Sequence, residues 1–142
     1  MNARDRLALF SAALWWGGLS AVGFLVVPML FAHLATPAIA GNMAARLFGA
    51  MTWVALACGL VLLACARERG TTSRMDWAGG ASMFVIGGML LALLSEFAVA
   101  PRIVARENLR LWHSVGSAMY ALQWVCAGVV LWKLGSEPRS TT

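Results

Sequence analysis

Four long apolar runs dominate this sequence and set what it can fold into. The hydrocarbon core of a bilayer is about 30 Å thick, and a helix that rises 1.5 Å per residue needs roughly 20 apolar residues to cross it. Backbone groups within lipid must find hydrogen-bond partners inside their own helix, and no run shows the alternation typical of a strand. We therefore predict an all-α fold, a four-helix transmembrane bundle, with helices at about Leu7–Ala32, Leu47–Ala66, Trp77–Ala100 and Leu111–Leu134.

Composition excludes a soluble domain. Of the 142 residues, 61% are hydrophobic and only 12% are charged, whereas a soluble domain averages about 25% charged residues. A small domain buries only about two-thirds of its surface, so a chain of this size would expose much of its apolar surface to water. We interpret residues 1–142 as one integral membrane domain whose environment is the lipid bilayer. Its predicted breaks are Ala35–Asn42, Arg67–Asp76 and Ala100–Asn108.

The charged residues predict an orientation rather than a nucleic-acid surface. The formal net charge is +5, but the basic residues flank apolar runs and form no basic helix face, so we expect no nucleic-acid partner. Lysine and arginine are enriched on the cytoplasmic side of membrane proteins. The larger group would share one side with both termini, which places the termini in the cytoplasm, as expected for a bacterial inner membrane. That group is Arg4, Arg6, Arg67, Arg69, Arg74, Lys133 and Arg139, against Arg46, Arg102, Arg106 and Arg110 on the other side.

Small residues at four-residue spacing predict the faces where helices meet, because they allow close approach within lipid. The first helix carries Ala13, Gly17 and Ala21. The third helix carries such a column and the fourth carries another, and each column includes a polar residue. The columns are Gly80, Gly88, Ala92 and Glu96 on the third helix, and His113, Ser117 and Ala121 on the fourth.

A polar layer is predicted near the outer interface. Alternating helix direction puts His33, Arg46, Glu96 and His113 at similar depth. A carboxylate in hydrocarbon is costly unless it is paired. We therefore expect Glu96 to lie within reach of Arg46, Arg102 or His113 and to stabilise the bundle.

The same layer allows a second interpretation, a ligand site. His33, Glu96 and His113 supply two imidazoles and a carboxylate, and thioethers lie at similar depth in Met29, Met43 and Met119. Methionine and histidine suit copper, whereas a histidine pair also suits haem iron. A path for a substrate or proton could use the same layer. Tyr120 and Gln123 lie at mid-membrane depth in the fourth helix. They favour interhelical hydrogen bonds over the lining of a cavity.

One stretch resembles a known family. The segment from Trp15 to Phe48 resembles the opening of the transmembrane-protein-205-like family, also described as domain of unknown function 4149, and the fourth helix is similar to the family's closing helix, which contains a histidine. The resemblance implies a compact four-helix membrane protein with no agreed activity. It also implies a distant relation to copper-resistance D-type membrane domains and to a membrane protoporphyrinogen oxidase that holds haem, although this chain lacks that oxidase's histidine early in the first helix. The matching residues are Trp16-Gly17-Gly18, Pro28-Met29-Leu30-Phe31, Ala40-Gly41 and Arg46-Leu47-Phe48.

These observations favour a non-enzymatic role. No motif of a nucleophilic, phosphate-binding or zinc-dependent enzyme occurs in a usable context, and we expect no cofactor unless the outer layer binds copper or haem. The predicted function is that of a structural or accessory subunit that packs with copies of itself or within a larger membrane complex. The alternative is metal, haem or small-solute handling through the outer polar layer.

Overall fold

The computed structural model describes residues 3–69 and 75–136, and within these ranges the chain is helical and contains no strand. Four helical spans are long and apolar enough to cross a membrane, which confirms the predicted all-α transmembrane fold. The first span joins α1, a π-helical segment η1 and α2; the second is α3; the third joins α4, a second π-helical segment η2 and α5; the fourth is α6. Their bounds are α1 Ala3–Ala21, η1 Val22–Val26, α2 Val27–His33, α3 Pro37–Arg69, α4 Met75–Leu94, η2 Ser95–Val99, α5 Ala100–Val104 and α6 Leu109–Gly135.

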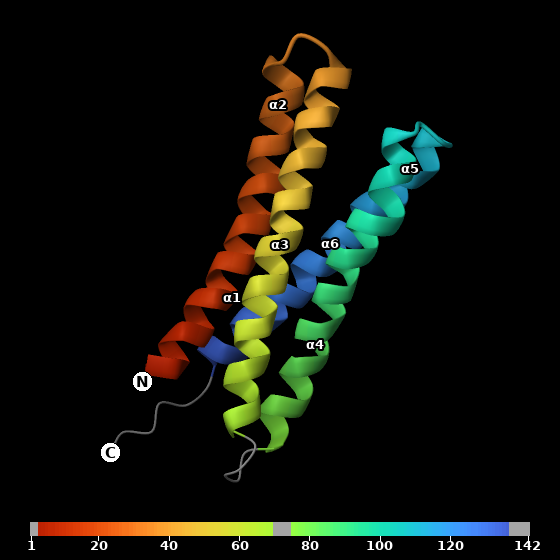
Figure 1. Cartoon of the computed structure of the whole chain (residues 1–142). Coiled ribbons are helices and arrows are strands. Elements are labelled where there is room, and N and C mark those ends of the chain that lie inside the picture. Colours follow the sequence, from red (N-terminus) through yellow and green to blue (C-terminus); the bar gives the residue numbers. More distant parts are fainter. Residues whose placement is uncertain (1–2, 70–74, 137–142) are drawn as a thin grey trace.

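The spans form two hairpins. Helix α1 packs against α3 and α6, and α4 packs against the same two helices, so the order around the bundle is α1, α3, α4, α6. Helix α1 begins and α6 ends at one end of the molecule, and the hairpins lie farther apart at the opposite end, where α2 and α5 are found (Figure 1). We call these the terminal end and the open end.

Helix boundaries differ from the prediction at two breaks. Helix α3 begins at Pro37, so the predicted break at Ala35–Asn42 is mostly helix. Proline is favoured in the first turn because its missing N–H would have no partner there, and the Ile39 N–H donates to Thr36 Oγ1 at 3.3 Å as an N-cap. The third break is shorter too, because helix continues through α5 to Val104 before a turn in which Arg106 and Asn108 have positive φ.

The two π-helical segments lie at equivalent places in the two hairpins. Each ends two residues before a proline, Pro28 or Pro101, and each contains a phenylalanine four residues before that proline. A proline inside a helix cannot donate to the carbonyl four residues back, and its ring clashes with that carbonyl. A π-helical turn widens the helix locally and accommodates the change.

A pseudo-two-fold relation extends to the packing. Trp15, which is fully buried, lies against Gly88, where an added Cβ would meet its ring at 2.6 Å. Gly88 is the residue of the third span that corresponds to Trp15 when the π-helical segments are aligned. Large side chains also fill glycine gaps in corresponding pairs of helices, with Trp16 of α1 against Gly128 of α6 and Met89 of α4 against Gly59 of α3. The two hairpins therefore pack as related halves around the contact between Trp15 and Gly88.

Candidate functional site at the second π-helical turn

Glu96 lies in η2, half-buried, and faces α3. A Cβ added at Gly49 would lie 3.2 Å from Glu96 Oε1 and 3.4 Å from Oε2, so the carboxylate rests directly against the backbone of α3. A larger residue at position 49 would crowd the carboxylate, which would have to move by a few tenths of an ångström. Glu96 thus points toward the neighbouring hairpin rather than directly into lipid.

The predicted partners of Glu96 do not pair with it. Within residues 3–69 and 75–136, Glu96 makes no ion pair and no hydrogen bond. Arg102 instead donates from Nη1 to the Ala98 carbonyl at 2.7 Å, and its guanidinium lies 4.5 Å from the ring centroid of Trp112. Arg46 and His113 are exposed on the outside of the bundle. Arg46, Glu96, Arg102 and His113 therefore share a depth but do not form one ion-paired layer.

The residues predicted as metal ligands do not lie together either. His33 is exposed at the end of α2, with Nδ1 3.0 Å from the Met29 carbonyl, and His113 is exposed on α6. In the described part of the chain, no group of three or more His, Cys, Asp or Glu side chains is placed to hold a metal ion. The structure thus does not bring His33, Glu96 and His113 together as a ligand set.

At the first π-helical segment, η1, the polar side chain beside a glycine is Tyr120 of α6. Its hydroxyl donates to the Leu19 carbonyl at 2.7 Å, and its ring packs edge-on against Phe48 at 5.1 Å between centroids. A Cβ at Gly23 would meet the Tyr120 ring at 2.5 Å. Backbone hydrogen bonds in a π-helical turn join residues five apart instead of four, so carbonyls at its edge can lack their usual N–H donor. The Tyr120 hydroxyl donates a hydrogen bond to one such carbonyl, that of Leu19.

The two π-helical turns therefore differ in their polar partners. At η1, Tyr120 of α6 enters the gap left by Gly23. At η2, Glu96 itself enters the gap left by Gly49, and the neighbouring Ser95 Oγ is buried without a hydrogen-bond partner among the described residues. A half-buried carboxylate can receive a proton or a cation, and a buried hydroxyl without a partner can receive a hydrogen bond from a polar solute.

Gln123 was the second polar residue expected at mid-membrane depth. Its side chain is buried in α6, with 4% of the residue exposed. It lies one helical turn closer to the terminal end than Tyr120. Polar side chains of the core therefore occur at more than one depth along α6.

Sequence reasoning missed the roles of Ser95, Gly23 and Gly49. A signal was present, because the same offset separates Phe24 from Phe97 and Pro28 from Pro101. Aligning the chain on these pairs sets Gly23 opposite Glu96. This alignment indicates both positions as places where one half receives or supplies a large side chain.

Comparison with known proteins identifies the family. Residues 10–111 match the family described as Domain of unknown function (DUF4149). No curated protein and no solved structure matches the chain. The match begins at Phe10 within α1, continues through the second and third spans, and ends at Leu111, near the start of α6. The chain belongs to this family.

Proposed function

We propose that this member of the domain of unknown function 4149 family is a non-enzymatic membrane subunit. It packs through the outer face of its first span with copies of itself or with other transmembrane helices of a host complex. The proposal rests on one observation, the position of the predicted small-residue columns relative to the bundle.

The bundle uses one of these columns and leaves two outside. Gly88 and Ala92 of the third span are buried inside, and Glu96 is half-buried. On α1, by contrast, Ala13 and Ala21 are exposed, and a Cβ added at Gly17 would meet nothing within 4 Å. The column on α6 is exposed as well, at His113, Ser117 and Ala121.

The outer face of α1 has a shape suited to another helix. The small residues Ala13, Gly17 and Ala21 form a shallow strip between Phe10 and Phe24, which are 73% and 64% exposed. In lipid there is no hydrophobic drive for association, so helices associate where small residues allow close packing. Bulky side chains at both ends would fix where the partner helix crosses.

Orientation and location follow from the charges. The terminal end carries more lysine and arginine in the sequence than the open end, which favours termini in the cytoplasm under the positive-inside rule. A bacterial inner membrane fits this arrangement. The short connections leave little surface outside the bilayer, so partner contacts within the bilayer are the economical solution.

The test is a mass measurement in mild detergent with matched variants. The wild-type protein should run as an assembly larger than the 15.2 kDa chain. Gly17→Leu should reduce it to the single chain, because leucine fills the strip. Gly87→Leu is the control, since Gly87 also has open space around it but lies on α4. A wild-type protein that is a lone chain both in detergent and in native membranes would contradict the proposal.

A second function is supported by separate observations, the Ser95 hydroxyl, which has no hydrogen-bond partner among the described residues, and the half-buried carboxylate of Glu96, the next residue of η2. These groups favour passage of a proton or a small cation past Glu96 toward the open end. Proteoliposomes loaded with a pH-sensitive dye would report such passage. Glu96→Gln should abolish it, whereas Glu107→Gln, in the turn before α6, should not. Equal dye responses in protein-free vesicles would remove this alternative.

A further inference from the structure

An apolar groove runs along the lipid-facing side of α6. Six residues of α6 that share one face line it, and Trp16 of α1 forms part of its wall. Gly128 forms part of the floor, with the Trp16 indole packed against it, and the groove has a volume of about 400 Å³. The residues from α6 are Trp124, Val125, Gly128, Val129, Trp132 and Lys133.

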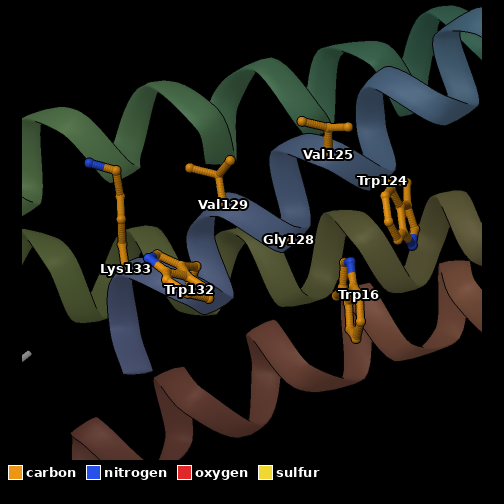
Figure 2. A pocket seen from close by; sticks show the side chains of 7 residues that line it. All are labelled: Trp16, Trp124, Val125, Gly128, Val129, Trp132 and Lys133. Carbon is orange, nitrogen blue, oxygen red and sulfur yellow. The ribbon is translucent and has the colours of Figure 1, made fainter. Parts of the chain in front are cut away.

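The aromatic wall of this groove is held in place. Trp124 Nε1 donates to Ser20 Oγ at 2.8 Å, and Ser20 Oγ donates to the Trp16 carbonyl at 2.8 Å. The rings of Trp16 and Trp124 lie 5.6 Å apart between centroids. Figure 2 shows both rings between α1 and α6, beside Gly128. A wall fixed before binding loses little conformational freedom when a ligand enters.

Charge marks one end of the groove. Lys133 lies in the last turn of α6, and its amine lies 3.2 Å from where a Cβ on Gly80 of α4 would be. In Figure 2 the Lys133 side chain, the last of the labelled residues on α6, extends toward α4. Trp132, beside it, is 77% exposed. A cation and an exposed indole at a helix end lie at the depth of lipid headgroups, whereas Val125 and Gly128 lie deeper, at the depth of acyl chains.

We infer that this groove binds an anionic phospholipid, with one acyl chain along Gly128 and Val125 and the phosphate beside Lys133. The polarity of the groove matches such a molecule along its length, because its wall is apolar and Lys133, the one charged residue among the described lining residues, lies at the headgroup end. A zwitterionic lipid such as phosphatidylcholine would use the same wall, but its quaternary ammonium would offset the attraction between its phosphate and the amine. The inference is independent of the assembly proposed for the outer face of α1.

The test compares lipids that share acyl chains and differ in headgroup. Purified full-length protein is titrated with dioleoyl-phosphatidylglycerol or dioleoyl-phosphatidylcholine, and retained lipid is counted by native mass spectrometry. The wild type should retain phosphatidylglycerol preferentially. Lys133→Gln should weaken its retention about fivefold, the effect of one basic residue on an anionic lipid, and Lys133→Arg should restore it. Arg110→Gln, at the other end of α6, is the matched control and should change nothing.

A second variant tests the acyl part of the groove. Val125 is 46% exposed, so Val125→Phe should narrow the groove without disturbing the core. It should lower retention of both lipids alike. Unchanged phosphatidylglycerol retention in Lys133→Gln would overturn the inference. A second result would also overturn it: the wild type binds no lipid and forms a dimer, and Val125→Phe dissociates that dimer. In that case the groove holds a helix of a second copy.

Discussion

Replacing Gly88 by alanine tests the central packing contact of the bundle. The new methyl group would lie 2.6 and 2.7 Å from two outer ring atoms of Trp15, closer than real side chains approach. Trp15 is 0% exposed, so its ring has little room to move. Overpacking of a filled core typically costs about 1–3 kcal/mol, and we expect the free energy of unfolding to fall by that amount.

The adjacent glycine supplies the control. A Cβ at Gly87 would meet nothing within 4 Å, so Gly87→Ala should leave the protein unchanged or stabilise it by up to about 1 kcal/mol, because alanine is the better helix former. Unfolding by SDS in dodecyl maltoside micelles, followed by tryptophan fluorescence, measures both variants. Trp15→Phe removes the two ring atoms concerned, so the double variant Trp15→Phe/Gly88→Ala should show favourable coupling of about 0.5–3 kcal/mol. Equal stability of Gly87→Ala and Gly88→Ala, with no such coupling, would refute the packing described here.

Three further predictions concern the π-helical turns and the orientation. Tyr120→Phe should lower the free energy of unfolding by about 1 kcal/mol in the same SDS titration, because the Leu19 carbonyl loses its donor; an unchanged value would show that the carbonyl finds another partner. Glu96→Gln should not lower the melting temperature in detergent, since no ion pair is lost among the described residues, and a fall larger than that of Glu107→Gln would reveal a partner for the carboxylate. In a variant whose cysteines are replaced by alanine, Ala105→Cys should react with an impermeant maleimide from outside intact cells, whereas Ser136→Cys should react only after permeabilisation; the reverse pattern would invert the orientation.

The apolar runs were sufficient to predict the four spans, because a bilayer demands long uninterrupted helices. Their ends were harder to predict. Pro37 and Pro101 fall within predicted breaks, but Pro37 lies in the first turn of α3 and Pro101 follows a π-helical turn that accommodates it. Both prolines therefore belong to helices that extend beyond the predicted boundaries.

The sequence predicted how deep in the membrane the candidate site residues lie, but not the direction in which their side chains point. Helix length and alternation set the depth of His33, Arg46, Glu96 and His113. The direction in which each points depends on how the helices rotate about their axes, and small-residue columns did not settle this. A column such as Ala13, Gly17 and Ala21 looks the same in sequence whether it faces a helix of its own bundle or a helix of another chain.

Site-specific photocrosslinking in native membranes tests the central claim most directly. Phe10 lies beside the small-residue strip of α1 and is 73% exposed, while Trp53 lies on α3 and is 64% exposed. Benzoylphenylalanine placed at either position changes one exposed aromatic residue into another. If the outer face of α1 is the assembly surface, the probe at position 10 will yield a protein adduct larger than the 15.2 kDa chain, and the probe at position 53 will not. A lone 15.2 kDa chain from both positions, or equal adducts from both, would contradict the account.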